Sequence, residues 1–289
     1  MLRKHLNKIL KYLKRALNRI YMTVKTKPRQ SFEASDIMLP KALDIFVVAF
    51  NDAKLIECQY HFMQKNLRSS EYHYIICDNS NKTEAARQIF EFCRKHNITY
   101  YRLPRFLYVD PSRSHGYALN WIYRYIIRRR KNRFAFIDHD IFPIRPLQLS
   151  EYTDRPLCGV KRERHGCWYP WAAFSFYDYE FLRNKSINFM PCRYKRKHLD
   201  TGGGNYKSVY KNLADGLWRE SCEHYIDIRS GKSFVWDKDV YKNRDDAVYE
   251  NAVELIDEKW LHIIGGAQWG GKHDKFALAM NMFGANKQN

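Results

Sequence analysis

The sequence predicts an α/β fold with a mostly parallel sheet flanked by helices, and a basic amphipathic helix in front of it. Between residues 43 and 137, short apolar runs rich in β-branched residues alternate with segments of helical spacing, which is typical of such folds. Several of the apolar runs end directly in polar residues. Because ligands bind beyond the carboxyl ends of parallel strands, we expect these polar residues to lie around one crevice.

The elements follow from the spacing of the apolar residues. The run at 44–50 is mostly apolar, as expected for a strand buried on both faces. We expect strands at 44–50, 72–77, 98–103 and 134–137, and helices at 55–67, 83–96 and 117–130. After Pro146 the alternation is lost. Stretches dense in aromatic residues and a Gly-Gly-Gly indicate an irregular second half built around a site.

Residues 1–24 predict a helix with two chemically different faces. Its apolar residues share one side: Leu2, Leu6, Ile9, Leu10, Leu13, Leu17, Ile20 and Tyr21. Residues 1–30 hold ten Lys or Arg and no Asp or Glu, so over half of the net charge of +19 lies there. This pattern is typical of a helix lying on an anionic membrane surface. A helix packed on the domain, or half of a helical dimer, would show it too. Residues 25–42 are expected to be a linker.

The composition narrows the class of protein. A 45% hydrophobic content is that of an ordinary globular protein, and no segment is apolar for long enough to span a bilayer. The N-terminus lacks the apolar core of a secretory signal. Seven cysteines without a C-x-x-C pair argue against a disulfide framework and against a zinc knuckle. We therefore expect a cytoplasmic protein, peripheral at the inner face of the cell membrane.

Two carboxylates, Asp138 and Asp140, follow the apolar run at 134–137. An unpaired carboxylate is costly to remove from water, so a cation is expected at this strand end. Residues i and i+2 of an extended segment point the same way, and both carboxylates can then bind one Mg²⁺ or Mn²⁺. A solvated turn is the alternative interpretation.

Four segments in this order, at 47–51, 75–80, 115–120 and 136–140, resemble GT-A-type nucleotide-sugar glycosyltransferases. The resemblance implies a Rossmann-like GT-A domain over 43–289, with a nucleotide-sugar-binding half at 43–146 and an acceptor-binding half at 147–289. In that superfamily the D-x-D binds the metal and the diphosphate, which implies this role for Asp138 and Asp140. The donor-binding residues that the resemblance implies are Asn51, Asp78, Asn79, His115, Gly116, Asn120 and Asp138.

The segment that begins at His262 extends the resemblance. Many GT-A enzymes carry a late His-x-x-Gly…Trp segment, in which the His completes the metal shell and glycines approach the phosphates. This implies a metal role for His262, phosphate contacts for Gly265 and Gly266, and added charge from Lys272. Imidazole beside carboxylates suits Mn²⁺. A histidine packed in the core is the alternative for His262.

Asp200 precedes the three glycines at 202–204. The resemblance puts acceptor-site carboxylates in this region, so Asp200 is the candidate base for the acceptor hydroxyl. An aspartate that caps a Gly-rich turn explains the residue equally well. The chain lacks the Glu-Asp pair common in inverting members, so the base and the stereochemistry both stay open.

The leading hypothesis is a metal-dependent glycosyltransferase of cell-surface polysaccharide synthesis. It would move a sugar from a UDP- or GDP-linked donor to a glycan or lipid-linked acceptor at an anionic membrane surface, with Mn²⁺ or Mg²⁺ as cofactor and no nucleic-acid partner. A basic nucleic-acid-binding protein explains the charge of +19 but gives the D-x-D no role. A metal-dependent phosphohydrolase also has strand-end carboxylates, but no phosphatase motif is complete.

Overall fold

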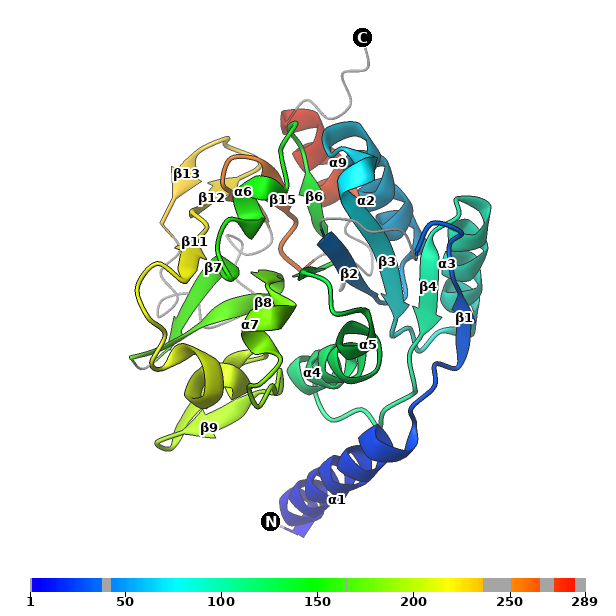
Figure 1. The fold of residues 1–289 in the computed structure, drawn as a ribbon, viewed down its shortest axis with the longest axis vertical. Helices are drawn as coiled ribbons and strands as arrows, with labels where there is room; N and C mark the ends of the chain where they lie inside the picture. Colours follow the sequence, from blue (N-terminus) through cyan, green and yellow to red (C-terminus); the bar gives the residue numbers. More distant parts are fainter. Residues whose placement is uncertain (1, 38–42, 165, 236–250, 266–272, 284–289) are drawn as a thin grey trace.

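A computed structural model of the chain describes residues 2–37, 43–164, 166–235, 251–265 and 273–283. It confirms the α/β fold with a mostly parallel sheet flanked by helices (Figure 1). The eight-stranded sheet, in the order β1-β4-β3-β2-β5-β8-β7-β11, consists of β1 (Gln30–Phe32), β2 (Leu43–Ala49), β3 (Tyr72–Asp78), β4 (Thr99–Arg102), β5 (Phe134–Ile137), β7 (Leu157–Arg164), β8 (Cys167–Tyr177) and β11 (Trp218–Glu220). The five-stranded sheet, in the order β13-β12-β14-β15-β6, consists of β6 (Ile141–Pro143), β12 (Glu223–Asp227), β13 (Ser233–Phe234), β14 (Ala252–Ile256) and β15 (Trp260–His262).

The remaining elements connect and cover these sheets. The hairpin β9 (Cys192–Tyr194) and β10 (Lys197–Leu199) pairs separately from them. The helices are α1 (Leu2–Val24), α2 (Ala53–Asn66), α3 (Thr83–Lys95), α4 (Pro111–Ile122), α5 (Arg128–Arg130), α6 (Ser150–Thr153), α7 (Tyr179–Leu182) and α9 (His273–Met282). Single 3₁₀ turns lie at Ser69–Glu71 and Gly203–Asn205, and π-helical turns at Tyr123–Ile127 and Tyr206–Tyr210. None of the described helices is both long enough and apolar enough to cross a membrane.

The strand order creates a place for a ligand. The chain adds β3 and β4 in parallel on one side of β2, then returns to add β5 in parallel on the other side. Where the order reverses in this way, the connections leave the sheet in opposite directions and open a crevice at the carboxyl ends of the strands. Every residue of β2, β3 and β5 is buried, so these strands form a rigid floor for that crevice.

Helices cover both faces of the parallel strands. Ile45 and Val47 belong to the core under α2 and α3, whereas Phe46 and Val48 belong to the core under α4. The alternation along β2 thus supplies both cores, as expected for a strand between two helical layers. Figure 1 shows α2 and α3 on the opposite side of the sheet from α4.

Helix α4 begins six residues before the expected start at Tyr117. The Asp110 side chain accepts the backbone N–H of Arg113, and Pro111 occupies the first turn. An aspartate cap followed by proline is a strong helix start. His115 and Gly116 therefore lie on a helix and not in a loop.

The later part of the chain shares its sheets with the earlier part. Strands β7, β8 and β11 complete the large sheet, and β8 pairs antiparallel with β5. Conversely, β6 comes from before residue 146 and forms the edge of the second sheet. The expected linker at 25–42 contains β1, which pairs with β4 and extends the large sheet. Strand pairing thus ties together the segments that the sequence pattern separates.

A buried ionic cluster anchors the start of β2. The carboxylate of Asp44 accepts two hydrogen bonds from Arg130, at 2.7 and 2.8 Å, and one from the ring of His73 at 2.8 Å. Burial by itself would raise the pKa of Asp44, but the bonds from Arg130 and His73 hold it below its ordinary value. The cluster therefore stabilises a charged, buried carboxylate at the start of β2.

We expect Arg130→Leu to lower the free energy of unfolding by roughly 3–5 kcal/mol, because it leaves the carboxylate of Asp44 buried without its main partner. Arg87 is the matched control, since it pairs with Glu84 and Glu91 on the exposed face of α3. Arg87→Leu should change stability little. Urea unfolding followed by circular dichroism measures both, and equal losses would contradict the role given to the buried cluster.

Candidate active site

A cleft of about 580 Å³ lies at the carboxyl ends of β2 and β5. Five residues that the sequence analysis selected line it: Asn79, His115, Asp138, Asp140 and Asp200. Val48 and Phe50 at the end of β2 lie on one side, and Tyr169 and Trp171 from β8 on another. The crevice predicted from the strand order is therefore also where most of the charged candidates gather.

The Asp-His-Asp segment is a turn and not the extended segment expected from the sequence. The N–H of Ile141 bonds back to the carbonyl of Asp138. The side-chain amide of Gln59 donates to the carbonyl of Asp138 at 2.8 Å and to the carbonyl of Ile141 at 2.7 Å. Gln59 is fully buried on α2. The turn changes the chain direction from β5 into β6, and both carboxylates still line the cleft.

Strand pairing brings His262 to this turn. β15 pairs antiparallel with β6, so that His262 lies opposite Ile141, and the N–H of Ile263 bonds to the carbonyl of Asp140 at 3.0 Å. The Nε2 atom of His262 lies 3.9 Å from Oδ2 of Asp140. The histidine is both buried and beside the D-x-D, so the two interpretations given for it are compatible.

A second carboxylate orients the His262 ring. Nδ1 of His262 lies 2.6 Å from Oε2 of Glu254, which is buried in β14 and also receives a bond from Arg162 at 3.1 Å. Burial opposes ionisation of Glu254, yet Arg162 and His262 hold its pKa well below its ordinary value. An anionic Glu254 fixes a proton on Nδ1 of His262 and leaves Nε2 to face Asp140.

His115 and Asp138 form a second pair across the cleft. Nε2 of His115, on α4, lies 3.4 Å from Oδ1 of Asp138. Removal from water raises the pKa of Asp138, His115 opposes the rise, and the neighbouring charge of Asp140 adds to it. Two neighbouring carboxylates in one turn repel each other when both are charged, so a bound cation would stabilise them.

The donor set fits a divalent metal that is held partly by its substrate. Asp138 and Asp140 offer carboxylate oxygens, and His262 offers the Nε2 atom of its ring. The other ring nitrogen, Nδ1, is already bonded to Glu254. Among the described residues, however, no three carboxylate, imidazole or thiol groups lie close enough to hold a metal by themselves. Mg²⁺ and Mn²⁺ commonly take one or two carboxylates together with phosphate oxygens, which is the arrangement these side chains allow.

Asp78 does not reach the cleft. Its Oδ1 accepts the backbone N–H of Ser80 at 2.8 Å, and its Oδ2 accepts the hydroxyl of Tyr100 at 2.7 Å. The residue is 1% exposed. Both oxygens are used to hold the turn after β3, so the structure gives Asp78 a supporting position in place of the expected nucleotide contact.

Asn51 is likewise used within the fold. It has a positive φ of 57°, its N–H bonds to the hydroxyl of Ser80, and its side-chain oxygen accepts the N–H groups of Asn81 and Lys82. These bonds tie the end of β2 to the end of β3. Asn79, which directly follows β3, lines the cleft, whereas Asn51 and Asp78 do not.

Gly116 and Asn120 face the segment at 188–191 and not the cleft. A Cβ atom on Gly116 would lie 3.0 Å from the sulfur of Met190, so the glycine permits close packing of α4. The side chain of Asn120 accepts the N–H of Phe189 at 2.8 Å and donates to Asn188 at 3.0 Å. In this structure Gly116 and Asn120 hold the segment at 188–191 against α4.

The Gly-rich turn presents Asp200 at the cleft. Gly202 has a φ of 91°, and a Cβ atom on Gly204 would lie 2.4 Å from the carbonyl oxygen of Asn188. Asp200 accepts the N–H of Thr201 at 2.8 Å, and its other oxygen lies 3.8 Å from Arg164. The carboxylate both caps the turn and lines the cleft, so the two interpretations of the sequence again coexist.

The remaining candidates, Gly265, Gly266 and Lys272, follow β15 in the sequence. Gly265 has a φ of 78°, a conformation that glycine adopts readily. Gly266 and Lys272 lie outside the described residues. The phosphate roles implied for these three residues stay predictions.

Three supporting residues were not predicted from the sequence. Glu254 had a detectable signal, because it is an acid in the middle of the apolar run at 252–256. Gln59 and Arg162 had none, since a glutamine on a helix and an arginine in a charged run are ordinary surface patterns. Arg162 lies 4.5 Å from the centre of the Trp171 ring, and that ring in turn lies 4.9 Å from His262.

Comparison with known proteins gives partial likenesses of structure. No protein-family model and no curated protein matches the sequence. The mannosyltransferase PcManGT from Pyrobaculum calidifontis, in complex with GDP-Man and Mn²⁺, is 12% identical over 62% of this chain and 56% of that chain, with a TM-score of 0.35. S. aureus TarS 1-349, in complex with UDP-GlcNAc, is 15% identical over 50% of this chain and 47% of that chain, with a TM-score of 0.33. The mannosyltransferase Ktr4p from S. cerevisiae is 10% identical over 62% of this chain and 67% of that chain, with a TM-score of 0.39.

The matched region thus spans about half the length of the first two of these proteins. At TM-scores of 0.33 to 0.39 the likeness decides neither the fold nor the activity of this chain.

We expect His262→Ala to weaken Mn²⁺ binding by about 10–100-fold, because it removes a nitrogen ligand beside Asp140. High Mn²⁺ should then partly restore binding, measured as loss of the free Mn²⁺ paramagnetic resonance signal in the presence of GDP or UDP. His224→Ala, which removes a partly exposed histidine paired with Glu258, is the matched control. Unchanged Mn²⁺ affinity in folded His262→Ala protein would exclude the ligand role.

We also expect Mn²⁺ affinity to rise with pH. Burial lowers the pKa of His262, but the bond to Glu254 and the charge of Asp140 outweigh it and raise the pKa above its ordinary value. The metal must therefore displace a proton. In the metal-free protein this proton stabilises the fold below about pH 6.5, and the contribution is lost as pH rises through the folded-state pKa. Calorimetry in buffers of different ionisation heat measures the released proton, and affinity independent of pH would contradict the prediction.

Proposed function

We propose that the chain is a metal-dependent glycosyltransferase that moves a sugar from a nucleoside-diphosphate donor to an acceptor hydroxyl. One observation carries the proposal. Asp138 and Asp140 after β5 and Asp200 beside the Gly-rich turn line the crevice where the strand order reverses, and His262 on β15 lies 3.9 Å from Asp140. Two carboxylates and an imidazole at one position suit a diphosphate leaving group, and a separate carboxylate suits a hydroxyl nucleophile.

The metal would be held by Asp138, Asp140 and His262, with donor phosphates completing its shell. When bound, Mg²⁺ or Mn²⁺ supplies a Lewis acid that neutralises the charge of the departing diphosphate. Glu254 keeps the His262 ring oriented and its Nδ1 protonated. Gln59 would hold the Asp-His-Asp turn in place through its bonds to the carbonyls of Asp138 and Ile141.

Asp200 would accept the proton of the acceptor hydroxyl as the sugar is transferred. Geometry is the first requirement of such a base, and Asp200 lines the same cleft with its side chain partly open to solvent. Trp171, which is partly exposed, lies nearby, and aromatic faces pack well against the C–H faces of sugars. Other aromatic side chains of β8, such as Phe174 and Phe176, are buried in the core.

We further propose that the enzyme works at an anionic membrane surface in the synthesis of a cell-surface glycan. The support is helix α1, which carries the basic and apolar faces predicted from the sequence and leaves the apolar face exposed. The +19 charge of the chain then has an anionic partner without nucleic acid.

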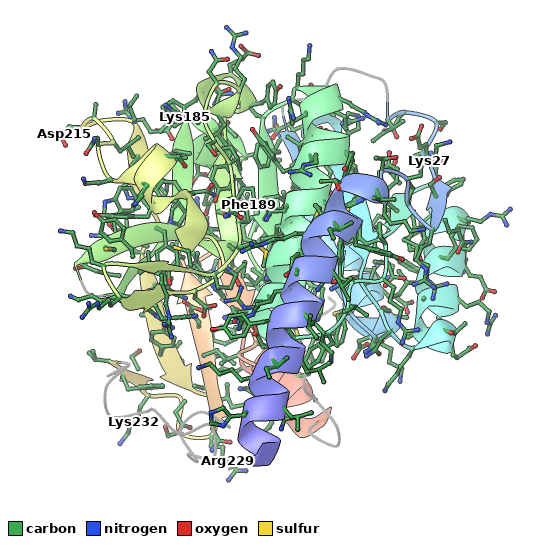
Figure 2. All side chains as sticks on the ribbon, turned by 90° about the horizontal axis from the view of Figure 1, so that it is seen from below. Lys27, Lys185, Phe189, Asp215, Arg229 and Lys232 are labelled. Carbon is green, nitrogen blue, oxygen red and sulfur yellow. The ribbon has the colours of Figure 1, made fainter. Side chains whose placement is uncertain are left out.

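The decisive experiment is turnover of a panel of UDP- and GDP-linked sugars with Mn²⁺, with and without acceptor. We expect Asp140→Asn to reduce turnover at least about 100-fold, because it removes a charged metal ligand with almost no change of shape. Asp215→Asn is the matched control, since Asp215 lies in an exposed turn at the edge of the molecule (Figure 2). Thermal unfolding of both variants should match that of the wild type.

Two results would contradict the proposal. Full activity of Asp140→Asn in metal-limited buffer would exclude the metal role of the D-x-D. Donor turnover that no acceptor accelerates would favour the metal-dependent phosphohydrolase instead.

A further inference from the structure

Helix α1 is fixed to the domain by its polar side. Asn18 and Met22, one turn apart, are the buried residues of this helix among those whose side chains are described, 1% and 7% exposed. Its carboxyl end is also held, because Trp121 and Tyr125 donate to the carbonyls of Lys25 and Met22 at 2.6 Å. An amphipathic helix that packs on its own domain normally buries its apolar face. In α1 that face points outward.

The outward face is continuous along the helix. The apolar residues on it are each about half exposed or more: Leu6, Ile9, Leu10, Leu13, Leu17 and Ile20. Figure 2 shows α1 as the element nearest the viewer, lying across that side of the molecule. An apolar face of this size on an element already docked by its other side marks an interaction surface.

The connection between β4 and α4 joins this face to the cleft. The side chain of Asn18 donates to the carbonyl of Leu107 and accepts the N–H of Leu107, both at 2.8 Å. We call these two bonds the Asn18 clasp. Beside it, the ring of Tyr21 packs edge-on against the ring of Phe106, with 6.1 Å between the ring centres. Leu107 and Tyr108 are 44% and 61% exposed, and Tyr108 also lines the cleft. The exposed side chains of Leu107 and Tyr108 therefore lie between α1 and the mouth of the candidate active site.

The charge on this surface indicates its partner. Exposed cations such as Lys8, Lys11 and Arg19 flank the apolar face, and the first acidic residue of the chain is Glu33. A second copy of the chain would bring like charges together. An anionic bilayer instead offers apolar chains to the face and negative headgroups to its flanks, and each Lys or Arg near such a surface adds to binding.

We propose that α1 and the Leu107–Tyr108 tip dock as one surface on an anionic bilayer, so that the mouth of the cleft lies at the lipid headgroups and the acceptor is lipid-linked. The choice of acceptor rests on the proposed glycosyltransferase function. The docking surface itself does not. A head group carried by a bilayer lipid could then reach Asp200 while its chains stay in the membrane.

Co-sedimentation of the full chain with vesicles tests the surface. With equal parts phosphatidylglycerol and phosphatidylcholine, Leu13→Asp should lower the partition coefficient by about tenfold or more. Leu107→Asp should also lower it, although it lies outside the helix. The matched control is Leu278→Asp. Leu278 is 43% exposed, close to the 44% of Leu107, and it lies on α9 at the other end of the molecule in Figure 1. Equal binding of wild type and Leu107→Asp would overturn the combined surface.

The Asn18 clasp has its own test. Asn18→Ala removes both bonds to Leu107, so Leu107→Asp should have a smaller effect in that background than in the wild type. An equal effect in both backgrounds would overturn the coupling. Hydrogen exchange checks it in the unaltered protein: vesicles should slow exchange at 104–110 as well as in α1. A lipid-free dimer that Leu13→Asp converts to monomers, with no vesicle binding, would show that a second copy covers the face.

The acceptor is tested with labelled donor and membranes of the cells that make the protein. We expect wild type to label organic-extractable lipid and Leu107→Asp to label it less, while both hydrolyse the donor equally. Label found only in water-soluble glycan, equally for both proteins, would overturn the lipid-linked acceptor. Absence of any donor turnover would contradict the proposed function, and vesicle binding would still decide the surface.

Discussion

The N–H of Ile263 bonds to the carbonyl of Asp140 at 3.0 Å, and the pairing of β15 with β6 continues from there. This contact joins segments separated by more than a hundred residues. It sets the register that puts His262 beside Asp140, and β14 in turn puts Glu254 beside His262. A slip of one residue would point His262 to the other side of the sheet, since side chains alternate along a strand. The composition of the candidate metal site thus depends on backbone pairing.

Buried charge is handled in the same way at both ends of the parallel strands. At the start of β2, Asp44 is paired with Arg130 and His73. In the lining of the cleft, Arg162 bonds to both Glu254 and Glu223. Burial and the hydrogen bond to Glu254 raise the pKa of Glu223 to about 7, although Arg162 opposes the rise. Removing one partner of such a group leaves an uncompensated buried charge, which couples stability to the integrity of the site.

In the proposed function, different residues of the cleft would serve different chemistry. The D-x-D turn and His262 offer ligands for a cation and its phosphates, whereas Asp200, Tyr169 and Tyr108 lie where an acceptor would enter. The Asn18 clasp connects this entry side with α1. The helix that first stands out in the sequence as a separate basic element is therefore held against the segment that borders the cleft.

The sequence by itself determined the parallel strands, the carboxylates at the end of β5 and the two faces of α1, because each depends on periodicity or on neighbouring residues. It placed His262 and Asp200 in the candidate site only through a resemblance. Tertiary structure alone decided that Asp78, Asn51 and Asn120 are used inside the fold, and that Glu254 and Gln59 support the site. A polar side chain reaches a ligand only if no nearer partner takes its hydrogen bonds, and those partners come from distant segments whose register no local pattern records.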